Sequence, residues 1–415
     1  MRWIYNFFIN GFQLLLPILG LFFKRLKTFR IERQQTKKEL ENFIAHSQAP
    51  LIWIHVASLG EYEQVVPVIK AIKPQFNNYK ILLSFFSDSG YRTKKQKSVA
   101  DFETYLPLDT QKQSQTFVNF VKPQFAIFVK YDIWPNFLRE LHKQHIKTFL
   151  VAARFRPQQL YFKAYGRFFK QALMSFQHIF VQDQASGHLL NSINYTDWTL
   201  TGDTRYDRVY QQLSQDNSLD FMQDFKQNHD CMVCGSTWPE DEKALLPTLN
   251  DKSLRLKFVV APHQIKPETV NQFQKQLQKS SIKYSEIKTQ DLSQYDILIL
   301  DTVGLLTKVY AYANIAYVGG AMGKTGLHNI LEPAAFGTPI IIGPNHEKFP
   351  EAKALQQVGG LAVVSKPSEL QNIVHKLTDE QGLKTKMSKA AHDFIQNKKG
   401  ATALTCKEIL QNTSK

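Results

Sequence analysis

The chain has 415 residues, of which 43% are apolar and 21% are charged, with 51 Lys and Arg against 36 Asp and Glu. This length predicts two domains, the apolar fraction excludes a wholly disordered or collagen-like protein, and 3 Cys exclude a disulfide framework. The formal net charge of +15 predicts an anionic partner and leaves nucleic acid, anionic lipid and phosphorylated small molecules open.

The first predicted element is a helix over residues 3–23, a segment without a charged side chain. At about 1.5 Å per residue, such a helix is just long enough to cross a bilayer. Three polar residues and a proline lie on one face of this helix, at Asn6, Asn10, Gln13 and Pro17. This pattern favours a helix that lies in the membrane interface or packs on protein, and it leaves the topology of the segment open.

Basic residues follow this helix, beginning with Lys24, Arg25 and Lys27. A cleaved signal peptide would instead place its cations before the apolar segment and a small-residue cleavage site after it. We therefore expect an uncleaved membrane anchor with its basic flank over residues 1–38, and we expect the cations to face the cytoplasm.

Short apolar segments separated by helical stretches fill the rest of the chain. They lie at 51–57, 80–86, 125–130, 147–152 and 178–182, and then at 231–234, 257–261, 296–300, 314–318, 338–342 and 361–364. Such a pattern is typical of parallel sheets covered by helices on both faces. The two blocks predict an α/β protein with two doubly wound, Rossmann-like domains over 39–205 and 206–390. Ligands of such paired domains bind in a cleft, outside the carboxyl ends of the strands.

The candidate site residues of the first block are therefore one glutamate and three pairs of residues, each of which lies at or just after the end of a predicted strand. Glu61 follows the first strand and a glycine, where a carboxylate can act as a general base, or merely stabilise the dipole of a helix. The pairs are Ser87 with Ser89, Lys130 with Asp132, and Arg154 with Arg156. The serines indicate an anion-binding turn or a simple turn, and the arginines indicate a phosphate cradle or a solvated helix face.

A glycine-rich segment follows the strand at 314–318 in the second block. Its candidate residues are Gly319, Gly320, Gly326, His328, Asn329 and Glu332. Glycines let backbone amides approach a phosphate, and the helix that follows directs its positive end to the same place. The spacing matches neither a Walker loop nor the dinucleotide fingerprint. Glu332 is placed to bind a ribose diol or to cap the helix.

Further polar residues follow two other strands of this block, namely Ser236, Thr237, Pro262 and His263. We expect them to complete a nucleotide phosphate site. No metal is predicted, because His263, His328 and His346 lack the spacing of a ligand set. The C-x-x-C pair lies inside a strand-like segment without a second pair, which favours buried core over zinc or redox chemistry.

Taken in order, these motifs resemble the 3-deoxy-D-manno-octulosonic acid (Kdo) transferases of lipopolysaccharide biosynthesis. The resemblance extends from the anchor to about Gly360 and rests on HVASLGEYEQ, YLPLD, WPN, AARFRP, TGDTRYD, GSTWPEDE, DTVGLLTKVYAYANIAYVGG and GLHNILEPAAFGTPIIIGP. It implies the GT-B glycosyltransferase fold, with a C-terminal helix over 391–415 that returns toward the first domain. It also implies a cell inner membrane location, with the catalytic domains on the cytoplasmic face, and no cofactor.

The resemblance further implies inverting transfer of Kdo from CMP-Kdo, bound by the second domain, to the lipid A precursor (lipid IVA), bound by the first. Glu61 matches the proposed catalytic base of the family. Two positions depart from the family pattern. Lys130 stands where a Glu is common, with Asp132 as the second acid of that motif. Pro262-His263-Gln264 stands in place of P-R-H, so that a phosphate role of the Arg passes to His263 or Lys266.

Two other kinds of function compete with this interpretation. One is a different GT-B enzyme, a transferase or an epimerase, that uses a UDP-sugar. The other is a non-catalytic membrane-surface protein whose degenerate sugar-nucleotide domain binds anionic lipid. Nucleic-acid binding is not expected, because no recognised motif accompanies the positive charge.

Overall fold

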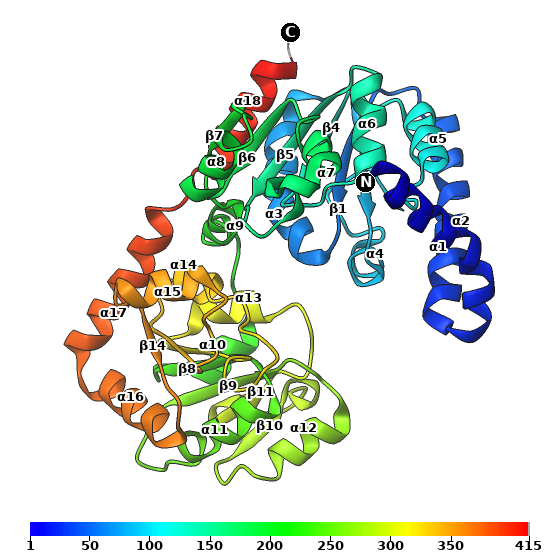
Figure 1. Cartoon of the computed structure of the whole chain (residues 1–415). Coiled ribbons are helices and arrows are strands. Elements are labelled where there is room, and N and C mark those ends of the chain that lie inside the picture. The colour runs from blue at the N-terminus through cyan, green and yellow to red at the C-terminus, as the bar shows by residue number, and fades with distance from the viewer. Residues whose placement is uncertain (414–415) are drawn as a thin grey trace. The chain divides into compact units, whose positions relative to one another are not determined.

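The computed structural model describes residues 1–413, which form two compact units (Figure 1). The first unit contains residues 1–208 together with the C-terminal segment from residue 399, and the second contains residues 209–398. Each unit has a seven-stranded sheet in which all paired strands are parallel. The predicted fold class, two doubly wound α/β domains, is confirmed.

The chain begins with a hairpin of two helices, α1 (Arg2–Phe22) and α2 (Lys24–His46), joined at Phe23. Gly20 lets the helices approach closely, because a Cβ there would lie 3.3 Å from the Lys27 backbone. By length and composition α1 is able to cross a membrane, yet part of it packs on the first unit. Asn6 is buried, whereas Asn10 and Pro17 of the same predicted face are exposed.

Two hydrogen bonds fix the start of α1 to the sheet region of the first unit. The hydroxyl of Tyr5 donates to Oδ2 of Asp109 at 2.7 Å. The side-chain amide of Asn136 donates to Oδ1 of Asn6 at 2.9 Å. Burial raises the pKa of Asp109 to about 7, although the Asn136 and Phe137 amides and Tyr5 all donate to this carboxyl.

The strand order of the first sheet is β3-β2-β1-β4-β5-β6-β7. The strands are β1 (Leu51–Val56), β2 (Lys80–Phe85), β3 (Phe102–Tyr105), β4 (Phe125–Val129), β5 (Lys147–Ala153), β6 (His178–Val181) and β7 (Trp198–Leu200). The helices are α3 (Leu59–Ile72), α4 (Asp88–Lys94), α5 (Gln111–Val121), α6 (Pro135–Lys143), α7 (Arg167–Leu173), α8 (Gln184–Asn191), α9 (Thr204–Gln212) and α18 (Ala401–Thr413), with short 3-10 turns at η1 (Lys73–Gln75), η2 (Leu160–Phe162) and η3 (Ala164–Gly166).

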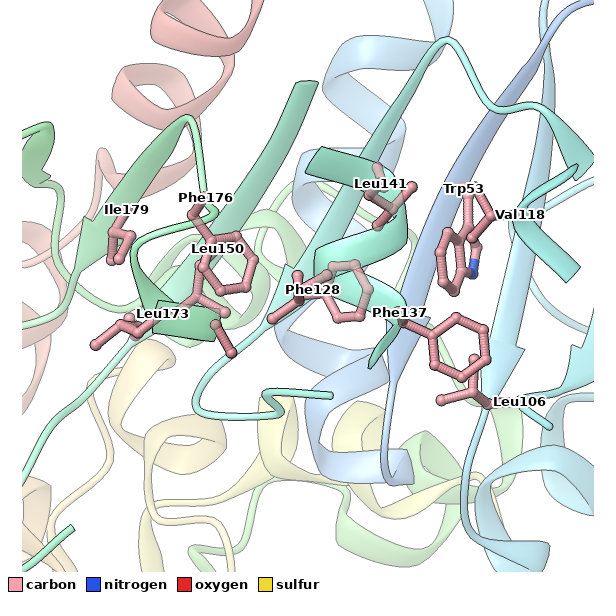
Figure 2. Close-up of a cluster of buried hydrophobic side chains, with 14 of the residues drawn as sticks. Trp53, Leu106, Val118, Phe128, Phe137, Leu141, Leu150, Leu173, Phe176 and Ile179 are labelled. Atoms are coloured by element: carbon pink, nitrogen blue, oxygen red, sulfur yellow. The ribbon is translucent and has the colours of Figure 1, made fainter. Parts of the chain in front are cut away.

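Alternate side chains of the first sheet enter two separate cores. Trp53 of β1 joins a cluster with α2, α5, α6 and α7, part of which is drawn in Figure 2. Its neighbour Ile54 joins the opposite cluster with α3, α4 and the C-terminal helix α18. Burial on both faces explains why these strands are continuously apolar in the sequence.

The helix α18 is fixed to the first unit by a buried carboxylate. Asp207 accepts hydrogen bonds from the backbone N–H of Gly400 at 2.6 Å and of Thr402 at 2.8 Å. Cys406 and Ile409 of the helix then pack in the core beside α3. The last helix of the chain therefore completes the core of the first unit.

The strand order of the second sheet is β10-β11-β9-β8-β12-β13-β14. The strands are β8 (Cys231–Thr237), β9 (Lys257–Pro262), β10 (Ser281–Lys283), β11 (Ile297–Ile299), β12 (Ile315–Val318), β13 (Ile340–Ile342) and β14 (Leu361–Val363). The helices are α10 (Asp220–Lys226), α11 (Pro239–Leu249), α12 (Pro267–Gln274), α13 (Leu306–Val309), α14 (Leu331–Ala335), α15 (Pro350–Gln357), α16 (Pro367–Asp379) and α17 (Gln381–Gln396), with 3-10 turns at η4 (Tyr284–Glu286), η5 (Leu292–Gln294) and η6 (Tyr310–Tyr312).

The C-x-x-C pair lies in β8, where Cys231 and Cys234 are free and fully buried. Cys234 packs with helices α11, α12, α16 and α17 in the core of the second unit. Burial raises the pKa of Cys231 to about 12, so this thiol stays protonated and unreactive. The prediction that these cysteines belong to the core is confirmed.

Candidate active site

Glu61 lies in the first turn of α3, directly after strand β1. Its side chain is only 6% exposed, and Oε2 accepts a hydrogen bond from the Ala57 backbone N–H at 2.5 Å. The carboxyl group is therefore folded back onto the end of β1, which contradicts the interpretation of a solvated residue at a helix start. A buried and positioned carboxylate at the end of a central strand has the geometry of a general base.

The pKa of Glu61 is raised, chiefly by burial and then by the negative charge of Asp132. The Ala57 N–H, the charge of Lys130 and the nearby His55 act in the opposite direction. A carboxyl group with a raised pKa is a stronger base than an ordinary glutamate. The structure thus brings three residues of the predicted site, Glu61, Lys130 and Asp132, into one electrostatic group.

A buried histidine that the sequence analysis missed connects this group to the core. His55 is fully buried, and its Nε2 lies 2.6 Å from Oδ2 of Asp132. On the other side of the ring, Nδ1 lies 2.8 Å from Oγ of Ser84.

Two tryptophans fix this arrangement. The indole N–H of Trp53 donates to Oγ of Ser84 at 2.8 Å, and that of Trp134 approaches Nε2 of His55 at 3.0 Å. Trp134 belongs to the W-P-N motif, in which Pro135 starts helix α6. A polar residue within an otherwise apolar strand was the sequence signal that identifies His55.

Lys130 and Asp132 occupy the loop that follows β4. Lys130 has a φ of +61°, in the left-handed region, and its N–H donates to the carbonyl oxygen of Val151. This backbone conformation turns the chain sharply at the end of the strand, so that residues 130 and 132 both remain close to Glu61. The lysine found in place of the glutamate common in the family therefore contributes a positive charge to the group.

The other predicted residues of the first unit differ in their surroundings. The Ser87 side chain caps helix α4 and its N–H donates to Ala57 O, next to Glu61, while the exposed Ser89 lies within the first turn of that helix. Arg154 pairs with Asp183 at 3.1 Å. Arg156 is exposed and shares a surface hollow with Tyr131, which lies between Lys130 and Asp132.

In the second unit, backbone N–H groups of the glycine-rich segment are hydrogen-bonded within the protein. The N–H of Gly320 donates to the buried Asp241 at 2.7 Å, and that of Gly326 donates to Gly320 O at 3.2 Å. Gly319 lies against strand β8, where a Cβ would come within 2.4 Å of Ser236 O. Its own N–H donates to Gly235 O at 2.9 Å. These three amides are thus occupied within the protein, and the glycines serve close packing rather than an open phosphate cradle.

Trp238, His263 and His328 form a stacked group above these glycines. The rings of Trp238 and His263 have centroids 4.6 Å apart and an interplanar angle of 25°. His328 lies 4.5 Å from His263, and its Nε2 accepts the indole N–H of Trp238 at 3.0 Å. Burial, followed by the proximity of His263, lowers the pKa of His328 to about 4. A neutral His328 that accepts at Nε2 keeps its hydrogen at Nδ1.

The remaining donor-site candidates lie at strand ends and in α14. Ser236 has a φ of +55° at the end of β8, and Thr237 donates its hydroxyl to Glu242 at 3.1 Å. Asn329 donates its side-chain amide to Glu332 at 2.9 Å. Pro262 ends β9 directly before His263. Among residues 1–413, no group of three or more His, Cys, Asp or Glu side chains has the arrangement of a metal site.

Comparison with known proteins gives sequence relatives along nearly the whole chain. Residues 25–208 match the family model described as 3-deoxy-D-manno-octulosonic-acid transferase (kdotransferase). A 3-deoxy-D-manno-octulosonic acid transferase of Haemophilus influenzae is 26% identical over 416 residues, which cover 96% of each chain. A protein of the same name from Rickettsia felis is 28% identical over 375 residues, covering 87% of this chain and 78% of the relative.

Solved structures of low sequence identity share the fold. A UDP-GlcNAc 2-epimerase from Neisseria meningitidis superposes with a TM-score of 0.62 at 14% identity, covering 87% of this chain and all of that chain. A glycosyltransferase from Rickettsia africae superposes with a TM-score of 0.56 at 11% identity, covering 88% and 98%. These neighbours confirm the GT-B architecture, and the sequence relatives show that the chain is similar to 3-deoxy-D-manno-octulosonic acid transferases.

Proposed function

We propose that the protein transfers Kdo from CMP-Kdo to the lipid A precursor (lipid IVA) with inversion at the transferred sugar. The observation that most supports this proposal is the buried Glu61 carboxylate, fixed at the end of β1 with a raised pKa, in a chain similar to Kdo transferases. The relatives named above are Kdo transferases, which supports Kdo as the transferred group.

In this proposal Glu61 accepts the proton of an acceptor hydroxyl while the hydroxyl oxygen bonds to the anomeric carbon of Kdo. The bond from that carbon to the phosphate oxygen breaks, and the electron pair leaves with CMP. His55 and Asp132 position the loop after β4, and the charge of Lys130 favours the ionised form of Glu61. Acceptor contacts are assigned to Ser87, Ser89, Lys130, Asp132, Arg154 and Arg156.

The second unit would bind the donor. We assign this role to Ser236, Thr237, Pro262, His263, Gly319, Gly320, Gly326, His328, Asn329 and Glu332. The three glycine amides are occupied, so the side chains in this set would supply the hydrogen bonds to the nucleotide. The Nδ1–H of the neutral His328 is one such donor, and the stacked ring of His263 is a surface for a planar base.

We further propose that α1 anchors the enzyme on the cytoplasmic face of the inner membrane. Its outer side exposes large apolar side chains, including Trp3 at 88% and Phe7 at 75%. Its inner side is bound to the first unit through Tyr5 and Asn6. This division favours a helix that lies in the interface with one face in lipid, and Lys24, Arg25 and Lys27 would then meet anionic headgroups.

The test is transfer by purified enzyme in detergent or liposomes, with the lipid product identified by mass spectrometry. We expect CMP release only when lipid IVA is present. Glu61→Gln should lower kcat by about 10²- to 10⁴-fold, as for loss of a general base, with an unchanged circular dichroism spectrum. Glu63→Gln is the matched control, because Glu63 lies in the same helix but pairs with Lys94 and Arg208.

Three results would contradict the proposal. Near-normal turnover by Glu61→Gln would remove the assignment of the base. Binding of UDP in preference to CMP, with no Kdo transfer, would favour a different GT-B enzyme that uses a UDP-sugar. Liposome binding without any sugar transfer would instead indicate a non-catalytic membrane-surface protein.

A further inference from the structure

A pocket lies within the first unit between the α1–α2 hairpin and the segment from β3 to α5. Its volume is about 510 Å³, and sites for small ligands span about 300–1,000 Å³. The apolar part of its wall includes Leu16, Phe29, Leu40, Leu108, Phe117 and Phe120. These side chains come from three helices, α1, α2 and α5, and from the loop between β3 and α5, so the pocket exists only while the hairpin is packed on the unit.

Cations outnumber carboxylates around this apolar wall. Arg30, Arg33, Lys37 and Lys112 line the pocket, and Glu41 is the one acidic side chain that lines it. Glu41 lies 3.7 Å from Lys37 at the exposed surface. The remaining cations face an apolar cavity, which is an arrangement suited to a ligand with both a hydrocarbon chain and a negative charge.

The two arginines show how this charge is held. Arg33 donates from Nε to Leu106 O at 3.1 Å and from Nη2 to Phe86 O at 2.7 Å, and its guanidinium lies 3.4 Å from the centre of the Phe29 ring. Asp88 and Glu32 also act electrostatically on this guanidinium, so its charge is partly balanced within the protein. Nε of Arg30 is buried without a hydrogen-bond partner among the described residues. Burial of unsatisfied cationic nitrogen is costly, and an anionic ligand would offset that cost.

The pocket adjoins both the candidate active site and the apolar outer side of α1. Phe86, whose carbonyl binds Arg33, packs its ring 4.7 Å from that of Trp134, and Trp134 contacts His55. In the other direction, Leu16 and Pro17 belong to α1, whose neighbouring Leu15 and Ile18 are exposed. A single amphiphile can therefore extend from a membrane-facing helix, through the pocket, toward Glu61.

We propose that this pocket binds one acyl chain of the acylated, phosphorylated acceptor, and that Arg30 and Lys112 contact its phosphate. The inference rests on the proposed function and adds a subsite to it. It accounts for an apolar cavity at which cations outnumber carboxylates, and for the Arg30 Nε that lacks a hydrogen-bond partner among the described residues, in the unit assigned to the acceptor. The acceptor would be partly withdrawn from the bilayer, with its sugar hydroxyl directed to the base.

The first test fills the pocket from an exposed position of α5. Thr116 is exposed and lines the pocket, so Thr116→Trp adds bulk without disturbing a core. We expect the ratio of kcat/KM for the acylated acceptor to that for its deacylated form to fall about tenfold, or about 1.4 kcal/mol. Gln115→Trp, at an exposed position of the same helix outside this pocket, should keep the original ratio. An unchanged ratio for Thr116→Trp would overturn the proposal.

Charge is tested in the same way with Arg30→Gln against Lys38→Gln. Both residues lie in α2, but Lys38 is exposed and does not line the pocket. We expect KM for the phosphorylated acceptor to rise about tenfold for Arg30→Gln. Removal of the acceptor phosphate should abolish the difference between the two variants. Equal effects of both variants, with or without the phosphate, would overturn the role of Arg30.

A second measurement requires no turnover. An acceptor with a photoreactive group at the end of one acyl chain is incubated with the full-length protein in vesicles, and the cross-links are mapped by mass spectrometry. Cross-links to Phe117 or Phe120 of α5 are expected, and Thr116→Trp should remove them. Cross-links confined to the exposed side of α1 would overturn the proposal. If the unsubstituted protein transfers no Kdo, the proposed function fails, whereas the cross-links still show whether the pocket holds an acyl chain.

Discussion

Nε2 of the fully buried His55 lies 2.6 Å from Oδ2 of Asp132, although the two residues belong to different strand ends of the first sheet. The pair joins β1 to the loop after β4, and both members act on the electrostatics of Glu61. His55 is itself held from the other side by Ser84. The imidazole thus acts as a positioning residue between the core of the unit and its candidate base.

The first prediction concerns this pair. In His55→Asn, Asp132 loses its partner and becomes a mobile second carboxylate beside Glu61. We expect kcat to fall by about ten- to a hundredfold, which corresponds to about 1.4–2.7 kcal/mol, with little change in KM for the donor. Kinetics of Kdo transfer measures this effect.

His178→Asn is the matched control, because His178 also lies in a strand of the first unit and also contacts a hydroxyl, that of Thr199 at 2.9 Å. It should retain activity. If the role of His55 were purely structural, its replacement would change KM and kcat together and would lower the midpoint of unfolding. The denaturation curve of His55→Asn is therefore recorded as well. Full activity of His55→Asn would remove the positioning role.

The second prediction is a pair of opposite shifts in the pH dependence of kcat/KM. Glu61 must be ionised to act as a base, so the rate rises as the pH passes upward through the pKa of Glu61, which is raised above its ordinary value. Asp132→Asn removes a charge that raises this pKa and should move the acidic limb to lower pH. Lys130→Asn removes a charge that lowers it and should move the limb to higher pH.

Asparagine is the chosen replacement at position 130 because it tolerates the φ of +61° found there. Glu63→Gln serves as the control, since Glu63 is ion-paired at the surface of α3 and should leave the limb in place. Shifts of Asp132→Asn and Lys130→Asn in the same direction would show that Glu61 is not the titrating group.

The third prediction concerns the attachment of α1. Tyr5→Phe removes the O–H that binds Asp109 and leaves the carboxyl with its two backbone donors. Above pH 7 this carboxyl is mostly ionised, because its pKa is about 7. A hydrogen bond to a charged group contributes roughly 1.5–3 kcal/mol, so α1 should open locally far more often at pH 8.

Hydrogen exchange of the amides in α1 measures this opening. Tyr165→Phe is the control, since Tyr165 is 62% exposed. Unchanged exchange in α1 of Tyr5→Phe would mean that the helix is held by its apolar contacts alone.

The fourth prediction separates backbone strain from close packing in the glycine-rich segment. Gly320 and Gly304 have nearly equal φ values, +96° and +92°. A Cβ at 320 would come within 2.0 Å of Gly326 O, whereas a Cβ at 304 would meet nothing within 4 Å. Gly304→Ala should therefore cost only the left-handed backbone strain of about 1–2 kcal/mol.

Gly320→Ala should cost clearly more and should also weaken binding of the donor nucleotide. Urea denaturation and calorimetric titration with CMP measure the two effects. Equal destabilisation by the two substitutions would contradict a role of Gly320 in close packing.

The sheets could largely be predicted from the sequence because their inner strands are buried on both faces. β1 and β4, for example, are continuous apolar segments and were located within one residue of their bounds. The sequence analysis missed β3, β7 and β10, and all three are edge strands. An edge strand is short and half-exposed, as Trp198 and Thr199 of β7 are, so it lacks the apolar continuity that marks the others.

Only part of the candidate site could be predicted from the sequence in this way. Glu61, Lys130 and Asp132 follow adjacent parallel strands, and the carboxyl ends of such strands meet at one edge of a sheet. His55 and Asp241 could not be found in this way, because their partners come from distant parts of the chain. The occupation of the Gly320 amide by Asp241 is likewise a tertiary contact that a glycine motif does not reveal.

The position of α18 has a consequence for biosynthesis. Residues 209–398 form the second unit as one continuous segment, so this unit needs no residue from elsewhere in the chain to complete its core. The first unit is translated earlier, but its core lacks Cys406 and Ile409, and Asp207 lacks the amides of Gly400 and Thr402, until the last residues emerge. The half of the protein that is made first is therefore the half that is finished last, and a nascent chain would display an incomplete apolar face beside α3 throughout the synthesis of the second unit.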